Sequence, residues 1–272
     1  MAFVRTAALL GLLTGILLAI GFFFAGIAGM TIALVIALMI NLITYWFSDK
    51  IVLSIYRAKP SENKKLNAMI KKLAKEAEIP EPKVYTVPQK VPNAFATGRS
   101  PSHSAIAVTE GLLDLLDDDE IEAVVSHEMG HIKNRDTLIS TLAATIAGAV
   151  SYLAQLAWWG MFSRDREGGN IILLPLIIFA PFASMLIRLA ISRGREFQAD
   201  YTGAMISNKP LALASALSKI SNVAEKHPIR GNSATSHMWI VNPFSGSDFV
   251  KLFMTHPPVE ERIERLKAFS RK

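Results

Sequence analysis

The stretch EIEAVVSHEMGHIKNR, at residues 120–135, contains the pattern that decides how the rest of the chain must fold. Its apolar residues recur at helical spacing, and three aspartates at residues 117–119 precede it, as is typical of a helix N-terminus. His127 and His131 lie one turn apart on the same helix face, so both imidazoles can approach one cation. Glu128 lies about a sixth to a third of a turn away from them. The stretch therefore predicts a helix with two metal ligands and an acidic neighbour.

A second polar helix, predicted from SRGREFQADY at residues 192–201, offers a third ligand. Glu196 and Asp200 are four residues apart there and share a face. Catalytic zinc sites use three protein ligands and leave one position open, and two histidines with one glutamate are a common set. We therefore expect Glu196 to complete a zinc site with His127 and His131. Asp200 is expected to accept the other ring N–H of a ligand histidine, which fixes its tautomer.

The position of Glu128 predicts hydrolytic chemistry. Its carboxylate reaches a water molecule on the metal without displacing it, which is where a general base is needed. We therefore expect one zinc ion per chain, with Glu128 as the base. Two alternatives remain open: the five-residue His-Glu pattern arises by chance in some chains, and Glu196 could simply pair with Arg193 or Arg195 on a solvated face.

Four apolar segments predict an integral membrane protein. Of the 272 residues, 51% are hydrophobic, which is more than a soluble domain of this size needs. Residues 7–26 and 31–47 form an N-terminal pair joined by a glycine-rich link at residues 27–30, without a convincing signal-peptide cleavage site. Residues 138–160 and 171–191 form a second pair between the two metal-binding helices. The second pair could instead be re-entrant, or buried in a soluble core.

The distribution of positive charge predicts the topology. Of the 29 Lys and Arg residues, 13 lie in residues 49–136 and 12 lie from residue 193 to the end. Basic residues accumulate in cytoplasmic segments, so both termini and the metal site are expected in the cytoplasm. The chain then divides into an N-terminal transmembrane hairpin (1–48), the first part of a cytoplasmic catalytic domain (49–137), a second transmembrane or membrane-associated hairpin (138–191) and the second part of the catalytic domain (192–272).

The metal site is expected close to the bilayer. His131 lies seven residues before the third apolar segment, and Glu196 lies five residues after the fourth. At about 1.5 Å per helical residue, the ion would lie within roughly 10 Å of the membrane boundary.

The polar region before the first metal-binding helix predicts a small sheet with flanking helices. Strand patterns occur at KVYTV and in two segments separated by a Gly-Arg-Ser-Pro turn, which predict a hairpin. The expected elements are a helix at residues 62–77, strands at 83–87, 93–97 and 104–109, and a short helix at 110–116.

These motifs resemble the HtpX family of membrane-bound zinc metalloproteases. The resemblance rests on HEMGH, on SRGREFQADYTGA after a hydrophobic hairpin, on PNAFATG at residues 92–98 and on THPPVEERIERL at residues 255–266. It covers essentially the whole chain and implies the zinc ligands and the base named above. The implied fold is a mainly α integral membrane protein with a small β-sheet, in which a gluzincin-type zinc metalloprotease domain is interrupted by a hydrophobic hairpin. The implied task is quality control, in which misfolded or damaged membrane proteins are cut on the cytoplasmic side.

The resemblance also implies roles for weaker signals. One strand would be the edge strand that binds the substrate backbone by strand addition, with Asn93 the favoured side-chain contact. His256 would lie near the zinc ion and stabilise the oxyanion, although it could equally cap a helix. The implied substrate-binding residues are Asn93, Ala94, Phe95 and Ala96.

Other charged residues predict no further chemistry. The net charge of +6 does not indicate nucleic acid binding, because the basic residues are scattered; attraction to anionic lipid headgroups explains it better. Arg262 and Arg265 are expected to be surface charges on the last helix. The chain has no cysteine, which excludes thiolate ligands and cysteine nucleophiles.

Three alternative functions remain open on the sequence. A prenyl-protein endopeptidase of the CAAX type shares the same zinc chemistry but is expected to have more membrane spans. A zinc hydrolase that acts on a lipid or an amide also fits the motif. A metal-binding membrane scaffold without turnover is the third, although a scaffold has no use for Glu128 beside an open metal position.

Overall fold

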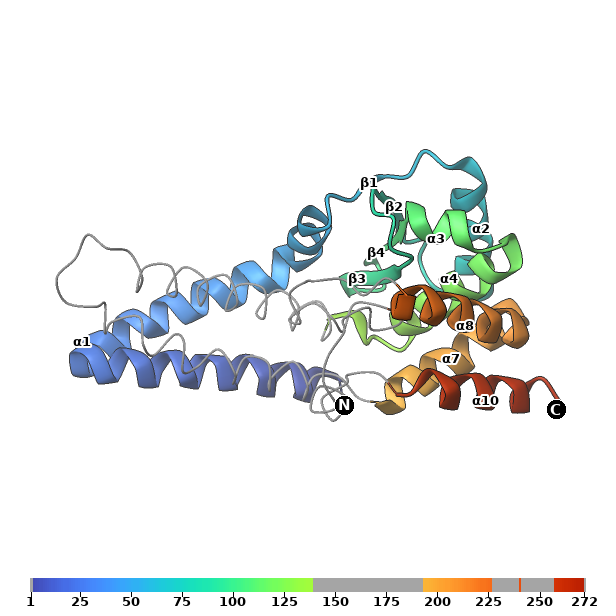
Figure 1. Cartoon of the computed structure of the whole chain (residues 1–272). Helices are drawn as coiled ribbons and strands as arrows, with labels where there is room; N and C mark the ends of the chain where they lie inside the picture. Colours follow the sequence, from blue (N-terminus) through green and yellow to red (C-terminus); the bar gives the residue numbers. More distant parts are fainter. Residues whose placement is uncertain (1, 139–192, 227–239, 241–256, 272) are drawn as a thin grey trace.

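The structure is a computed structural model, and it describes residues 2–138, 193–226, 240 and 257–271 (Figure 1). The predicted second hydrophobic hairpin lies outside the described residues except at its first position, and His256 also lies outside them. The described part contains long helices and a small sheet. Its mainly helical character and its mixed sheet agree with the expected fold class.

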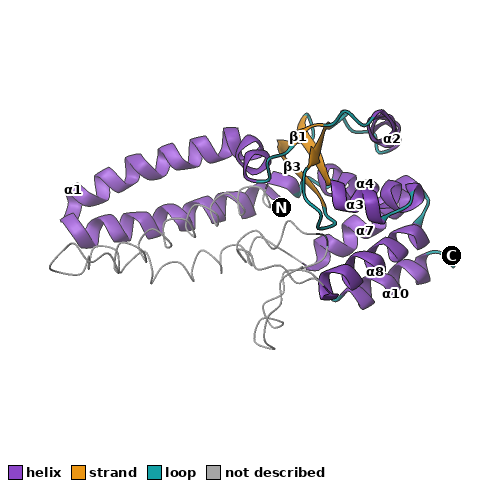
Figure 2. Ribbon diagram, turned by 45° about the horizontal axis from the view of Figure 1, so that its top comes forward, coloured by secondary structure: helices purple, strands orange, loops and turns teal. Residues whose placement is uncertain are grey.

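The first helix, α1 (Ala2–Ile55), is a hairpin of two helical arms rather than one rod (Figures 1 and 2). The chain reverses at Ala25 and Gly26, and Gly26 has φ 55° and ψ −139°, a conformation that side chains strongly disfavour. Between the arms, the Asn41 side chain donates a hydrogen bond to the hydroxyl of Thr14 at 3.0 Å. The N-terminal hairpin was predicted, but its turn lies at residues 25–26 instead of the predicted link at 27–30, because the reversal needs the positive φ of Gly26.

The returning arm of α1 has the properties of a membrane span. Within the described residues, Ala25–Phe47 is the one helical segment long and apolar enough to cross a bilayer. Its large side chains face outward, including Ile32 at 62% exposure and Leu42 at 59%. Exposed apolar surface of this extent is stable in lipid and costly in water. The second of the four predicted spans is therefore a candidate span, and the first predicted span forms the other arm.

The sheet has four strands in the order β1-β2-β4-β3. Strand β4 pairs in parallel with β2 and antiparallel with β3, and this last pair confirms the predicted hairpin. Gly98 has φ 129° at an irregularity in the pairing, and a side chain there would meet the backbone of His103. The strands are β1 (Lys59–Pro60), β2 (Lys83–Val87), β3 (Ala94–Ser100) and β4 (His103–Thr109).

Six further helices are described, and most of them gather on one side of the sheet (Figure 2). Helix α4 begins with a capping box, in which Asp117 and Glu120 each accept a backbone N–H from the other. The helices predicted before and around the metal ligands form with ends shifted by a few residues, and α8 is a helix that the sequence analysis did not predict. The six helices are α2 (Lys64–Glu76), α3 (Glu110–Leu115), α4 (Asp118–Lys133), α7 (Arg193–Ser207), α8 (Pro210–Lys226) and α10 (Val259–Phe269).

Two apolar clusters cover the two faces of the sheet. On one face, the alternate residues Ala94, Ala96 and Ile106 pack against the helical layer that includes α4. On the other face, the end of α1 packs on the sheet through Val52, Leu53 and Tyr56, which contact Phe95, Ala105 and Ala107. The membrane helix is therefore continuous with the core of the polar domain.

Candidate metal centre

Two glycines allow α4 and α7 to approach each other closely. A side chain at Gly130 would lie 2.9 Å from the carbonyl oxygen of Ala199, and one at Gly203 would lie 2.7 Å from the backbone of His127. Real side chains do not make contacts this short, so glycine is needed at the crossing. The close approach places residues of α7 directly beside those of α4, although the two helices are 60 residues apart in the sequence.

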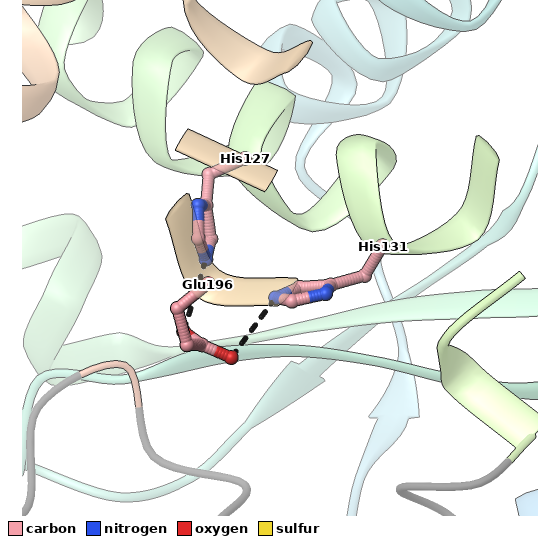
Figure 3. A group of neighbouring side chains, drawn as sticks. All are labelled: His127, His131 and Glu196. Atoms are coloured by element: carbon pink, nitrogen blue, oxygen red, sulfur yellow. Dashed lines mark ion pairs between the residues drawn. The ribbon is translucent and has the colours of Figure 1, made fainter. Parts of the chain in front are cut away.

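The three predicted ligands meet at this crossing (Figure 3). One atom each of His127, His131 and Glu196 lie within 4.8 Å of one another. The Nε2 atom of His127 is 3.9 Å from Oε2 of Glu196, and the Nε2 atom of His131 is 3.6 Å from Oε1. Tetrahedral zinc with ligands at about 2.0–2.1 Å separates neighbouring ligand atoms by roughly 3.3 Å. The donor set and its spacing therefore fit a zinc ion.

The Nδ1 atom of His127, on the side of the ring away from Glu196, faces the carboxylate of Asp200, as the sequence predicts. This Nδ1 atom is 2.9 Å from Oδ1 of Asp200, and both side chains are buried. This pairing directs the Nε2 atom of His127 toward Glu196, where an ion would bind. Asp200 is thus found where the sequence predicts it.

His131 has a corresponding carboxylate partner that the sequence analysis missed. Its Nδ1 atom is 3.6 Å from Oδ2 of Asp136, which is 7% exposed. Asp136 returns to the helix because α4 ends in a Schellman motif: Arg135 has φ 60°, and the backbone N–H of Asp136 donates to the carbonyl of His131 at 2.9 Å. The cap residues are Asn134 and Arg135 rather than glycine, so the motif is hard to recognise in the sequence.

The electrostatics of this cluster favour a bound cation. Burial alone would lower the pKa of His131, but the negative charges of Glu196, Asp136 and Glu128 raise this pKa to about 9. A cluster that binds a proton this strongly also attracts a metal ion.

Glu128 lies beside the ligands with its carboxylate held in place. Its side chain is 5% exposed, and its Oε2 atom accepts a hydrogen bond from the backbone N–H of Ala96 in β3 at 2.8 Å. Burial raises the pKa of Glu128, and the charge of Glu196 acts in the same direction; both histidines and the Ala96 N–H act against them. A raised pKa favours proton uptake near neutral pH, as a general base requires.

Arg262 is a correction to the sequence analysis, because it is buried rather than a surface charge. It is 0% exposed, and its guanidinium donates two hydrogen bonds to Asp200, at 2.7 and 2.8 Å. The paired charges hold the pKa of Asp200 below its usual range, although burial alone would raise it. Leu266, four residues later on the same face of α10, is also buried, and this spacing was the available signal. Arg265 is exposed, as expected, and lies over the ring of Phe197.

A path of hydrogen bonds and one close contact joins the start of β3 to the candidate ligand His127. The Oδ1 atom of Asn93 accepts the backbone N–H of Ile240, and the carbonyl of Ile240 accepts from Arg262. Arg262 in turn holds Asp200, which contacts His127. Asn93 is 1% exposed, so its side chain organises the site from within, and contact with a substrate stays a prediction.

The other predicted edge-strand residues present their backbone more than their side chains. Phe95 is 3% exposed because its ring packs on Tyr56 of α1, with ring centroids 4.9 Å apart. Ala94 and Ala96 point into the cluster that includes α4. Any strand added at β3 would therefore contact main-chain groups.

Comparisons with known proteins give relatives along the whole chain. A sequence profile of peptidase family M48 matches residues 60–270. The chain is 56% identical to a protein named protease HtpX homolog from Pyrococcus furiosus over 273 residues, which are 97% of this chain and 94% of the relative. A protein of the same name from Sulfurihydrogenibium sp. is 51% identical over 284 residues, with 98% and 96% covered.

A solved structure has a similar fold. The crystal structure of S. mikatae Ste24p aligns with a TM-score of 0.52 and 18% sequence identity. The alignment covers 96% of this chain but 62% of that longer protein. At this identity the likeness concerns the fold alone.

Proposed function

The chain belongs to peptidase family M48 and is a membrane zinc metallopeptidase, and from this premise we propose how its residues divide the work. His127, His131 and Glu196 hold one zinc ion in a gluzincin-type site, and Glu128 is the general base. The observation that carries this assignment is the convergence of the three ligand atoms within 4.8 Å, with the Glu128 carboxylate alongside. Membership of a peptidase family also removes the non-catalytic scaffold as an alternative.

Each residue has a distinct task in peptide hydrolysis. A bound zinc ion would lower the pKa of a coordinated water toward neutrality and polarise the scissile carbonyl. Glu128 accepts the proton of the attacking water and delivers it to the leaving amine. Asp200 and Asp136 each hold the Nδ1 side of one histidine, which keeps both Nε2 atoms directed at the ion. His256 remains our candidate for a donor to the oxyanion.

We further propose that the substrates are misfolded or damaged membrane proteins and that the site faces the cytoplasm. The charge distribution supports this side of the membrane, and both hydrophobic hairpins then span or enter the bilayer. Main-chain recognition at β3 suits unfolded chains because it reads no particular side chain.

A cleavage assay in detergent tests the peptidase assignment. The purified protein should cut an unfolded soluble polypeptide, lose this activity with a metal chelator and regain it when zinc is added. Cleavage that is insensitive to the chelator would contradict the zinc mechanism.

Thiol labelling in intact cells tests the topology, because the chain has no cysteine of its own. A cysteine introduced at the exposed Lys90 should resist a membrane-impermeant reagent until the cells are permeabilised. A cysteine at Gly168, in the predicted external link, should react at once. Labelling of the Lys90→Cys protein from outside would reverse the proposed orientation.

A further inference from the structure

We propose that the protein cleaves membrane-anchored polypeptides in one direction: it accepts an extended segment whose transmembrane span lies on the N-terminal side of the scissile bond. The inference rests on the proposed peptidase function and adds the class and the orientation of the substrate. It follows from how β3 lies against the membrane helix.

Two contacts fix the direction of β3 relative to α1. The guanidinium of Arg99 lies 4.7 Å from the centroid of the Trp46 ring, and the rings of Phe95 and Tyr56 are 4.9 Å apart. From Trp46 to Tyr56 the helix rises by about 15 Å, and from Arg99 back to Phe95 the strand spans about 13 Å. The two lengths agree, so α1 and β3 lie side by side and run in opposite directions.

The Trp46 end of this pair is the membrane end. Trp46 follows Tyr45 at the end of the candidate span Ala25–Phe47, and tryptophan and tyrosine concentrate at the membrane–water interface. One turn later, the ammonium group of Lys50 lies 5.4 Å from the centroid of the Phe47 ring, as expected where the polar side begins. Arg99, at the C-terminal end of β3, therefore lies at the inferred membrane boundary, and β3 runs toward it.

The catalytic carboxylate lies at a defined distance along this strand. The Ala96 N–H donates to Glu128, so the backbone of Ala96 faces away from β4 and toward the reacting groups. Three strand residues, or about 10 Å, separate Ala96 from Arg99 at the boundary. Among the described strands, β3 is at the end of the sheet order, so a substrate strand added there passes beside Glu128.

The direction of the substrate follows from strand pairing. Antiparallel pairs are more stable and more common than parallel pairs, and β3 runs toward the membrane. An antiparallel substrate strand therefore runs away from the membrane. A chain that leaves a span in the N-to-C direction enters the site directly, and its scissile bond lies roughly three to five residues after the boundary. A chain that precedes a span must first pass the site and turn back, which needs a longer linker.

A pair of anchored substrates tests this inference. Both carry the same cleavable linker of about ten residues, but one has its transmembrane span before the linker and the other has it after the linker. Each is placed in bilayer discs with the zinc-loaded protein, and the free linker peptide is assayed in parallel. We expect the substrate with the preceding span to be cut at least tenfold faster, near the boundary. Lengthening the linker by about 15 residues should remove the difference.

The outcomes separate this inference from the proposed function. Equal rates with the short linker, or faster cleavage of the substrate with the following span, would overturn the inference while the free peptide is still cut. Failure to cut the free peptide would contradict the peptidase function itself.

A measurement of the depth of fluorophores in the bilayer tests the orientation of the strands without an assay of peptide cleavage. His103 pairs with Ser100 at the membrane end of the sheet, whereas Glu110 follows the distal end of β4, about 23 Å away along the strand. Lipid-borne quenchers should quench a fluorophore on His103→Cys more strongly than one on Glu110→Cys. Stronger quenching at position 110 would overturn the proposed direction.

Discussion

The two ends of α4 carry buried carboxylates that are balanced in different ways. At the N-terminal end, Glu120 and Glu122 are buried. Lysines of α2, of α8 and of the position just before α8 form ion pairs with them. At the C-terminal end, among the residues that the structure describes, the carboxylates around the two histidines outnumber the nearby guanidinium groups. The four carboxylates there belong to Glu128, Asp136, Glu196 and Asp200, and the two guanidinium groups belong to Arg195 and Arg262.

This difference separates a structural network from a functional one. Lysine ammonium groups satisfy the N-terminal carboxylates, so that end of α4 is electrostatically complete within the described chain. The C-terminal end keeps an excess of negative charge. The same negative charge raises the pKa of His131 and favours a bound cation. A dication would neutralise this excess. One helix can therefore carry a charge-balanced structural network at its N-terminal end and a metal centre at its C-terminal end.

The largest expected difference concerns catalysis by Glu128. We expect Glu128→Gln to lower peptide cleavage about 100- to 10,000-fold, because the amide cannot accept the proton of the attacking water. Zinc content should be unchanged, since the ligands remain. Comparable cleavage rates of this variant and the original protein on an unfolded polypeptide would place the base elsewhere.

Loss of the buried guanidinium should have the next largest effect. Arg262→Leu leaves Asp200 buried without its partner, which should destabilise the protein by about 3–5 kcal/mol. Arg265→Leu, on the same helix, is the matched control, because Arg265 is exposed and its loss should be nearly neutral. Thermal unfolding in detergent measures both, and equal effects would refute the organising role of Arg262.

The glycine at the helix crossing should matter less than the buried charge. In Gly203→Ala, the added methyl group must push α7 away from His127, at a cost of about 1–3 kcal/mol and with weaker zinc binding. Gly15→Ala in α1 is the control, since a side chain there meets no atom within 4 Å. If titration with a zinc indicator gave the same affinity for both variants, the close crossing would not position the ligands.

The smallest effect is expected at the opposite end of α4. Burial alone would raise the pKa of Glu120, but bonds from Lys219 and Ser215 lower it overall, so its ionised form stabilises the fold. A lowered pKa contributes stability above the ordinary value near 4.5, and this contribution is lost as the pH falls through the lowered pKa. Glu120→Gln keeps the capping box and should cost at most about 1–2 kcal/mol at neutral pH.

The melting temperatures of Glu120→Gln and the original protein should therefore converge as the pH falls below 4.5 and through the lowered pKa of Glu120, with zinc content unchanged throughout. A difference in melting temperature that grows as the pH falls would contradict a lowered pKa for Glu120. Loss of zinc from Glu120→Gln would show that the N-terminal end of α4 also affects the metal site.

Much of this arrangement could be predicted because it depends on local spacing. The ligand pair His127 and His131, the third ligand candidate Glu196 and the contact of Asp200 all follow from residues four apart on helices. The strand hairpin was equally clear, since two apolar runs flank a recognisable turn. Each of these spacings lies within one helix or one hairpin, although only the crossing of α4 and α7 brings the two pairs together.

The missed features depend on how elements meet. Arg262 appeared to be a surface charge because arginine is rarely fully buried, and only the packing of α10 beside α7 brings it to Asp200. Asp136 lies beyond the end of α4 and reaches His131 through the positive φ of Arg135. Gly203 is required by a helix crossing that no local pattern specifies.

Zinc stoichiometry tests the central claim most directly. The original protein and Glu128→Gln should each bind one zinc ion per chain, whereas Glu196→Ala should lose it, because removing one of three protein ligands from a four-coordinate site weakens binding strongly. Glu264→Ala, which changes an exposed glutamate of α10, should retain the metal. Full zinc occupancy in Glu196→Ala would contradict the proposed centre at the crossing of α4 and α7.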